Sequence, residues 1–375
     1  MCTHKIYEEN LDVPEMKNMY PNACNIDIKE LSSIYDKDGL NTFVSFYFNG
    51  NDAKFILHRE KAVKSVLVKD ELENFDKTME KIMTYLKKND GTNIAIFASN
   101  RNGYFKVVPL PVKVKNALVV DASPYVRQLA ELSDEWKAFT LVLLNTNHAK
   151  IFSLSCGEIL DEEEMSADIM NKHKKGGWSQ ARFQRLRKGS IHAFLAEVVD
   201  ELGKIADENI IVAGPGQAKS EFLNLLPKKV REGVISVVDI DIKDEYGLLK
   251  ESFAIMAEKN REEKDTVLEH LKQEILIEGL AVHGVDETID AVKNGKAELL
   301  LVEAGFKMRG WVCERCQIAG RSSATTCPNC GNKTSEVDVI EEIIELAERT
   351  DVKVEFTDNE EIKKLGHVAA LLRYK

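Results

Sequence analysis

Four cysteines in the last quarter of the chain have the spacing of a metal-binding site. Cys313 and Cys316 form one Cys-x-x-Cys pair, and Cys327 and Cys330 form a second after ten intervening residues. Each pair makes a tight turn that points two thiolates at one position, and two such turns supply the four sulfur ligands of a structural Zn²⁺. Iron binds the same sulfur set, but zinc is the expected ion here. Because a closed four-sulfur shell has no open position for a substrate, we expect the ion to hold a loop and not to catalyse a reaction.

A second segment with a distinctive composition covers residues 171–188. It contains seven Lys or Arg residues, two adjacent glycines and no carboxylate, in a chain whose formal net charge is -11. Gly176 and Gly177 let the backbone take positive φ angles and approach another molecule closely. The cations around them favour a polyanion, most simply the phosphate backbone of RNA. The alternative interpretation is a solvated basic helix start with a flexible lead-in.

Other candidate residues are interpreted as structural. The glycine-rich residues 213–220 lack both the spacing and the Gly-Lys pair of a phosphate-binding loop, so they predict a tight turn between a strand and a helix. ATP or GTP hydrolysis is therefore not expected. His148 and His367 are interpreted as ordinary turn and strand residues, and His173 belongs to the basic segment.

Composition limits the class of protein. The chain has 375 residues, of which 44% are hydrophobic and 30% charged, and this predicts two or three globular domains. No apolar run approaches the roughly 20 residues that span a bilayer, and the start has no signal-peptide core, so we expect a cytoplasmic protein without a membrane partner. Seven cysteines, four of them clustered, argue against a disulfide framework. The acidic total disfavours general coating of nucleic acid, and no DNA partner is expected.

The elements that must position these residues alternate between strands and helices, which indicates a mixed α/β fold. We expect three domains, at residues 1–133, 134–268 and 269–375. The first contains a strand at 42–48, helical periodicity over 57–88 and a hairpin at Asn102-Gly103. In the second, a helix from about Ser179 to Lys204 follows the basic segment. The third contains the cysteine pairs, at residues 313–330, as a small inserted zinc-binding unit.

The order of residues in the basic segment resembles one family, the class I peptide chain release factors of the archaeal and eukaryotic type. The catalytic segment of that family runs Lys-His-x-x-Gly-Gly-Gln-Ser-x-x-Arg-Phe-x-Arg-Leu-Arg, and residues 172–187 match all but one of its defined positions. Four other parts of the chain also resemble segments of the family. They are residues 212–223, residues 284–292 with the Leu-rich run that follows, the cysteine pairs, and the closing Ala-Ala-Leu-Leu-Arg-Tyr-Lys. The resemblance covers the chain from about residue 136 onward.

The resemblance implies a three-domain release-factor-like architecture and a role at the ribosome. Gly176, Gly177 and Trp178 would form the catalytic tip at the peptidyl transferase centre. Contacts with ribosomal RNA would come from the basic and polar residues around that tip, which are Lys172, His173, Lys174, Lys175, Ser179, Arg182, Arg185 and Arg187. The third domain would bind a translational GTPase.

Two departures from the family pattern bear on function. Trp178 stands where the family has the Gln that helps to place the water attacking the ester of peptidyl-tRNA. The main-chain N–H of residue 178 remains a donor for a developing oxyanion, and an indole suits stacking on an unpaired base. The Asn-Ile-Lys-Ser and Tyr-x-Cys-x-x-x-Phe codon-reading motifs of the family are absent, and Val63-Lys64-Ser65 is interpreted as an exposed helix turn.

Two functions follow from these observations. The first is a ribosome A-site factor that, like a release factor, acts on peptidyl-tRNA and promotes its hydrolysis. The alternative is a non-hydrolytic rescue or hibernation factor that occupies the A site without reading a stop codon. The family motif around Trp178 favours the first function, whereas Trp178 itself and the missing codon motifs favour the second.

Overall fold

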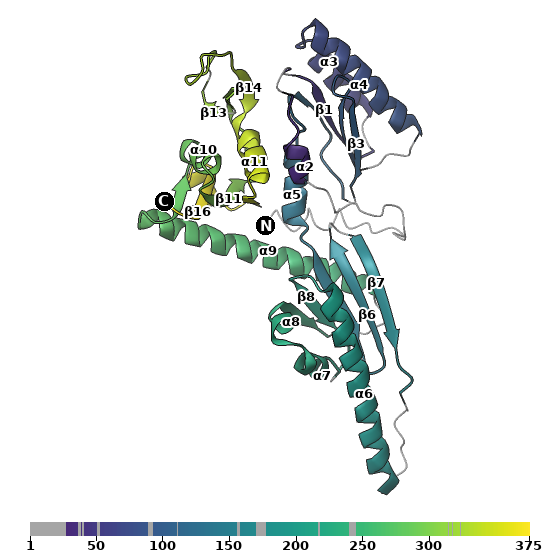
Figure 1. Ribbon diagram of the computed structural model, residues 1–375. Coiled ribbons are helices and arrows are strands. Elements are labelled where there is room, and N and C mark those ends of the chain that lie inside the picture. The colour runs from purple at the N-terminus through teal and green to yellow at the C-terminus, as the bar shows by residue number, and fades with distance from the viewer. Residues whose placement is uncertain are drawn as a thin grey trace. The chain divides into compact units, whose positions relative to one another are not determined.

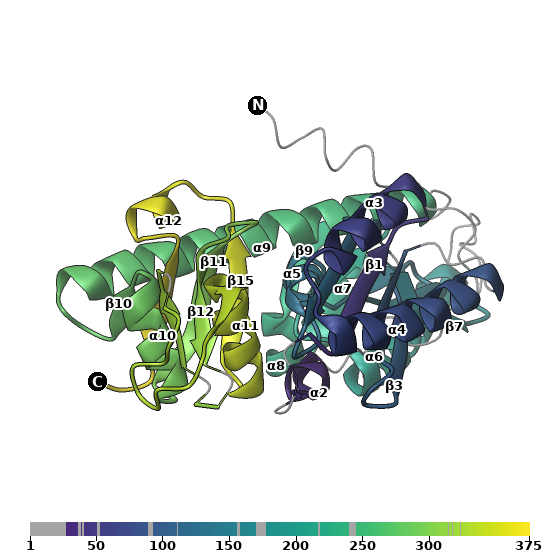
Figure 2. The same ribbon diagram turned by 90° about the horizontal axis from the view of Figure 1, so that it is seen from above.

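The computed structural model describes residues 28–375 with short gaps at 37–38, 40, 51–52, 89–92, 111, 156–157, 170–177, 217, 240–244, 314, 317 and 323. The chain divides into two compact units. The described residues of Trp136–Lys259 form one unit, and those of Asn22–Glu135 and Asn260–Lys375 form the other. The division into three domains at residues 133 and 268 remains a prediction. Mixed α/β composition, as expected from the sequence, is evident in both units (Figures 1 and 2).

The first part of the chain forms a four-stranded antiparallel sheet in the order β3-β2-β1-β4. The strands are β1 (Phe43–Phe48), β2 (Ile94–Ser99), β3 (Tyr104–Pro109) and β4 (Ala117–Asp121). The helices are α2 (Ile28–Ser32), α3 (Ala53–Lys64), α4 (Lys69–Lys88) and α5 (Arg127–Glu135). One sheet face packs on α4 and the other on α2 and α5. The hairpin predicted at Asn102-Gly103 is confirmed, since Gly103 has φ 63° in the turn between β2 and β3.

The helical periodicity over residues 57–88 corresponds to two helices and not to one. The chain turns at residues 65–68, and the carboxylate of Glu71 accepts a hydrogen bond from the N–H of Val68 at 3.1 Å. This bond satisfies a backbone donor at the start of α4, as capping side chains do. The two helices therefore form a hairpin, whose turn exposes Val66 and Val68.

The central unit is a five-stranded mixed sheet in the order β7-β6-β5-β8-β9. The antiparallel half pairs β5 with β6 and β6 with β7, and the parallel half pairs β5 with β8 and β8 with β9. The strands are β5 (Phe139–Leu144), β6 (His148–Ser155), β7 (Glu158–Ser166), β8 (Ile210–Ala213) and β9 (Val234–Val238). The helices α6 (Trp178–Ile205) and α7 (Ala218–Leu225) cover one face, and the start of α9 (Glu245–Leu276) covers the other. A short helix, α8 (Lys228–Glu232), leads into β9.

The last part of the chain has a four-stranded sheet in the order β10-β16-β11-β15. The strands are β10 (Ala281–His283), β11 (Ala297–Glu303), β15 (Lys353–Thr357) and β16 (Val368–Leu372). Helices α10 (Val285–Lys293) and α11 (Val339–Arg349) pack on one face, and the end of α9 with α12 (Glu361–Lys364) packs on the other. Between β11 and α11 the chain inserts a small antiparallel sheet of β12 (Arg309–Cys313), β13 (Ile318–Arg321) and β14 (Ser335–Asp338).

Buried charge joins the first and last parts of the chain within their shared unit. The side chain of Arg127 is 2% exposed, and it donates to Glu131 at 2.9 Å and to the carbonyl of Phe306 at 2.7 Å. Its backbone N–H donates to Glu341 at 3.3 Å. Burial raises the pKa of Glu341 well above its usual range, although Arg127 opposes that shift. Burial therefore favours the protonated form of the Glu341 carboxyl relative to an exposed glutamate.

Within the described residues, no helix is long and apolar enough to cross a membrane. This finding agrees with the even mixture of apolar and charged residues along α6 and α9.

Candidate functional site

The helix α6 carries the residues that follow the two glycines of the basic segment. Its buried residues repeat at helical spacing from Ile191 to Leu202, through Phe194, Leu195 and Val198, and they pack on the five-stranded sheet. Among the side chains of α6 that the structure describes, which begin at Ala181, Ile191 is the first buried one, and thirteen residues of the helix, from Trp178 to Ser190, precede it. At 1.5 Å per residue, this part of the helix extends about 20 Å before Ile191. It stands clear of the sheet in Figure 1.

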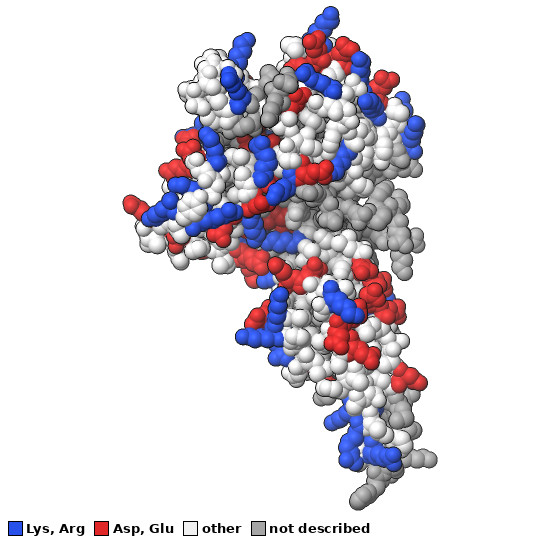
Figure 3. Space-filling model, viewed as in Figure 1, with Lys and Arg blue, Asp and Glu red and all other residues white. Residues whose placement is uncertain are grey.

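The protruding part of α6 combines cations with exposed apolar side chains. Arg182 and Arg185 are exposed and Arg187 is half-buried. Between them, Phe183 is 40% exposed and Leu186 is 50% exposed, although both are large apolar side chains. Figure 3 shows Lys and Arg side chains gathered at this end of the helix. An exposed surface with this mixture of groups is typical of a binding site, because the apolar groups remain in water unless a partner covers them.

The amino-terminal end of α6 adds a further attraction for anions. The first four N–H groups of a helix have no acceptor within the helix, and the helix dipole places partial positive charge there. In α6 these groups begin at Trp178 and Ser179. The predicted residues Lys172, His173, Lys174, Lys175, Gly176 and Gly177 lie outside the described residues. Thus the structure places Arg182, Arg185 and Arg187 on one protruding helix and gives the backbone of Trp178 and Ser179.

The four cysteines of the two Cys-x-x-Cys pairs come together at the end of the inserted sheet. Their Sγ atoms all lie within 4.8 Å of one another, and the Sγ atoms of Cys313 and Cys330 are 3.5 Å apart. A tetrahedral ion with metal–sulfur bonds of about 2.3 Å requires sulfur separations of about 3.8 Å. The described thiols are therefore close enough together to be compatible with one metal ion.

The backbone of these turns favours thiolate at one of the cysteines. Burial raises the pKa of the Cys327 thiol, but the N–H groups of Cys330 and Asn329, with the neighbouring thiols, outweigh burial and lower that pKa to about 7. The N–H of Gly331 donates to the carbonyl of Cys327 at 2.9 Å and closes the turn. A thiolate held in this way is the form of cysteine that binds metal.

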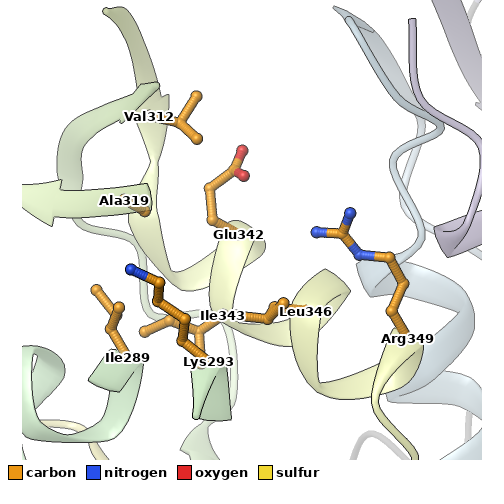
Figure 4. Close-up of a pocket in the computed structure, with 8 residues that line it drawn as sticks. All are labelled: Ile289, Lys293, Val312, Ala319, Glu342, Ile343, Leu346 and Arg349. Atoms are coloured by element: carbon orange, nitrogen blue, oxygen red, sulfur yellow. The ribbon is translucent and has the colours of Figure 1, made fainter. Parts of the chain in front are cut away.

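The inserted sheet is anchored on both sides. Gly310 lies so close to Val339 of α11 and to the backbone of Gly320 that a Cβ atom at this position would overlap both. Arg321 of β13 forms a two-pronged ion pair with Asp286 of α10. Figure 4 shows the shallow groove between α10, α11 and this sheet, with Ile289, Val312, Ala319, Ile343 and Leu346 among the residues that line it. These contacts hold the cysteine cluster to the main sheet of this part of the chain.

The glycine-rich residues 213–220 form the strand-to-helix turn that the sequence predicts. Gly214 has φ 142° and lies against the carbonyl of Leu144, where a side chain has no room. The ammonium of Lys219 is buried and donates to the carbonyl of Val238 at 2.8 Å and to Asp239. Lys219 therefore ties α7 to the end of β9 and does not project toward a ligand.

The two histidines that the sequence analysis interprets as ordinary turn and strand residues have structural partners. His148 contacts the carbonyl of Met165 at 3.1 Å, and His367 stacks on Phe306 with ring centroids 3.9 Å apart while bonding to Glu303. The lysine of Val63-Lys64-Ser65, at the end of α3, pairs with Glu60 at 2.6 Å and with Asp76 at 2.9 Å. These contacts explain each residue without a catalytic or codon-reading role.

Comparison with known proteins finds similarity to release factors in two regions of the chain. A family model described as "Bacterial archaeo-eukaryotic release factor family 10" matches residues 124–252, and one described as "eRF1 domain 3" matches residues 261–375. The chain is similar to proteins of the archaeal and eukaryotic-type class I release factor family. The family models thus match both the region that bears the protruding helix and the region that bears the cysteine cluster.

Sequence similarity to named release factors extends over nearly the whole chain. Peptide chain release factor subunit 1 of Thermococcus onnurineus is 27% identical over 423 aligned positions, which cover 99% of this chain and 98% of that protein. The protein of the same name from Pyrococcus abyssi is 28% identical over an alignment that covers 72% of this chain and 74% of that protein. A crystal structure of Archaeoglobus fulgidus Pelota is similar over 93% of this chain and 92% of that one, at 17% identity and a TM-score of 0.35.

Proposed function

We propose that this protein is a ribosome A-site factor of the release factor type that brings the end of α6 to peptidyl-tRNA at the peptidyl transferase centre. The observation that carries the proposal is the protruding helix, which presents Arg182 and Arg185 beyond Ile191, the first buried residue among its described side chains. A basic projection that is not packed on the protein can enter an RNA-lined channel, where phosphate attracts its cations. Similarity to release factors supports the ribosome as the source of that RNA.

The chemistry of the proposed reaction is ester hydrolysis. Water adds to the carbonyl carbon of the ester, the bond to the ribose oxygen breaks, and the products are a free peptide acid and a tRNA with a free hydroxyl group. Gly176 and Gly177 would allow close approach to the ester, and the N–H of Trp178, at the start of α6, would donate to the developing oxyanion. Lys172, His173, Lys174, Lys175, Ser179, Arg182, Arg185 and Arg187 would hold ribosomal RNA around this position.

The test is release of labelled peptide from ribosomes that carry peptidyl-tRNA in the P site. The wild-type protein is expected to release more peptide than the matched variant Gly176→Ala/Gly177→Ala, because added Cβ atoms hinder close approach of the backbone. Equal release by the two proteins would contradict hydrolysis by the wild-type chain.

A second candidate is a rescue or hibernation factor that occupies the A site without hydrolysis or codon reading. Two observations favour it: Trp178 replaces the family Gln, and Lys64 is held by Glu60 and Asp76 at the end of α3. The indole of Trp178 would then stack on an unpaired base of ribosomal RNA. This candidate predicts equal binding to vacant ribosomes with a stop codon or a sense codon in the A site, whereas a dependence on the stop codon would exclude it.

We also propose that a translational GTPase binds near the end of α9. Leu276 is 83% exposed and Ile277 71%, and the nearby chain exposes Leu280 and Tyr374. The backbone joins these residues, because Leu372 donates to the carbonyl of Leu280 at 2.9 Å. Exposed apolar residues next to the edge strand β10 fit a protein partner. A double variant, Leu276→Ser/Ile277→Ser, should lose binding of the GTPase, whereas Leu57→Ser, which changes an exposed leucine of α3, should keep it.

We propose that the protein acts in the cytoplasm, where it would meet the ribosome.

We also propose that the cysteine cluster holds one structural Zn²⁺ through Cys313, Cys316, Cys327 and Cys330. The purified protein should contain one equivalent of zinc, and Cys327→Ser should lose it. Zinc content equal in the variant and the wild type would refute the assignment. Reaction of the released ion with a chromogenic chelator gives the measurement.

A further inference from the structure

An open hollow lies between α4 and the edge strand β3, and none of its lining residues belongs to α6 or to the cysteine cluster. It has a volume of about 440 Å³ and is lined by Glu80, Lys81, Thr84, Tyr85, Lys88 and Phe105. Small-ligand sites occupy about 300 to 1,000 Å³, so the hollow is large enough for part of a polymer such as RNA. None of its residues belongs to a motif that the release factor resemblance identifies.

Two aromatic rings form one side of the hollow. The ring centroids of Tyr85 and Phe105 are 6.0 Å apart with an interplanar angle of 55°. The side chain of Phe105 is 39% exposed. Val107, two residues further along β3, packs against the core beneath α4. Because alternate residues of a strand share a face, Phe105 lies on the sheet face that α4 covers but beyond the packed core. Its ring is therefore held beside the helix with part of its surface open to solvent.

Cations lie beside the rings on the same face of α4. Lys81, Tyr85 and Lys88 are spaced four and three residues apart, so they share one side of the helix. Both lysines are exposed, as is Lys87 next to them, and Glu80 is the single carboxylate that lines the hollow. This local excess of positive charge contrasts with the formal net charge of -11 for the chain.

We propose that this hollow, defined by Tyr85, Phe105, Lys81 and Lys88, binds single-stranded RNA by stacking an unpaired base on Phe105 and pairing phosphates with the lysines. Every base offers a π face, so the contact does not require a particular sequence. A duplex does not fit this description, because its bases are already stacked and paired. The site goes beyond the proposed function, since it would give the first part of the chain an RNA contact that is separate from α6.

The test measures binding of a fluorescein-labelled oligouridylate by fluorescence anisotropy, with the full-length protein. All variants are made in an Arg182→Ala/Arg185→Ala background, so that the end of α6 does not dominate the signal. Phe105→Leu keeps an apolar side chain but removes the π face, and it should weaken binding by about tenfold. Phe105→Trp keeps a ring and should bind as tightly as the background protein.

The lysines are tested through the salt dependence of the same reaction. Lys81→Ala/Lys88→Ala should reduce the slope of log affinity against log salt by about 1.4, at about 0.7 for each lost phosphate contact with single strands. Val68→Ala, at a 64% exposed position in the turn before α4, is the control and should bind like the background protein. Unchanged thermal midpoints verify that each variant is folded.

Equal affinity of the Phe105→Leu and Phe105→Trp variants would overturn the inference. If Arg182→Ala/Arg185→Ala lowers the affinity for the oligouridylate and the further substitutions in the hollow do not, the inference is also overturned. That result would leave the proposed function of α6 intact. Conversely, loss of binding in Phe105→Leu with no peptide release in the ribosome assay would support this site while refuting hydrolysis by the tip.

Discussion

Removal of two guanidinium groups from the protruding part of α6 should change the salt dependence of ribosome binding. Arg182 and Arg185 are exposed and precede Ile191, the first buried residue among the described side chains of the helix, so Arg182→Ala/Arg185→Ala leaves the region from Ile191 onward untouched. Each lost phosphate contact lowers the slope of log affinity against log salt by about 0.7 to 0.9, so the double variant should lose about 1.5. Between about 50 and 200 mM salt, the wild type should therefore lose about eightfold more affinity than the variant.

The assay is co-sedimentation of the protein with vacant ribosomes over a series of salt concentrations. The matched control is Lys228→Ala/Lys229→Ala, which removes the same charge from α8 in the same unit, away from the protruding end of α6 (Figure 1). The control should keep the wild-type slope. If both double variants reduce the slope equally, then net charge and not the position of the cations governs binding, and the reasoning about α6 fails.

Two further predictions concern stability. Arg127→Met should lower the free energy of unfolding by about 3 kcal/mol, because it removes buried charge-assisted hydrogen bonds to Glu131 and Phe306. The control is Arg309→Met, at a side chain that is 94% exposed, which should lower the free energy of unfolding by less than about 1 kcal/mol. Urea titration measures both values. Burial raises the pKa of Glu348 to about 7 and that of Asp121 to about 6, with the N–H of Ala122 opposing the second shift. A folded-state pKa above the unfolded value gives stability that is fully present below the unfolded pKa and is lost as pH rises through the folded pKa, so the urea midpoint should fall between pH values of about 4 and 7. Glu348→Gln/Asp121→Asn should flatten this dependence, and an unchanged pH profile in that variant would contradict the assignment.

Much of the local structure could be predicted from the sequence. The helix expected from about Ser179 to Lys204 is observed as Trp178–Ile205, because its apolar residues repeat at helical spacing over five positions. The cysteine cluster could be predicted because the residues of each pair are only three positions apart, and the structure brings the two pairs together. Local spacing was sufficient in both cases.

Long-range contacts could not be predicted in this way. The hollow at Tyr85 and Phe105 depends on the packing of α4 beside an edge strand, and neither residue belongs to a recognisable motif. The contacts of Arg127 with Phe306 and Glu341 join residues that are about two hundred positions apart in the chain. An arginine in an amphipathic helix is usually exposed, and only tertiary packing shows that this one is buried.

The break within residues 57–88 shows a different limit. The apolar residues keep helical spacing on both sides of the turn, so periodicity alone favours one long helix. The hydrogen bond from Val68 to Glu71 starts the second helix, and a Glu three residues into a helix is a weaker signal than a run of apolar residues. The sequence pattern predicted helix correctly for both segments but did not locate the turn.

The measurement that tests the central claim most directly is peptide release by Trp178→Gln. The claim is that the chain immediately before α6 reaches the ester of peptidyl-tRNA, and the resemblance to release factors implies a Gln at position 178. The account predicts that Trp178→Gln releases more labelled peptide from P-site peptidyl-tRNA than the Gly176→Ala/Gly177→Ala variant does. Release by Trp178→Gln that does not exceed release by this glycine variant, with both proteins bound to the ribosome, would contradict the claim.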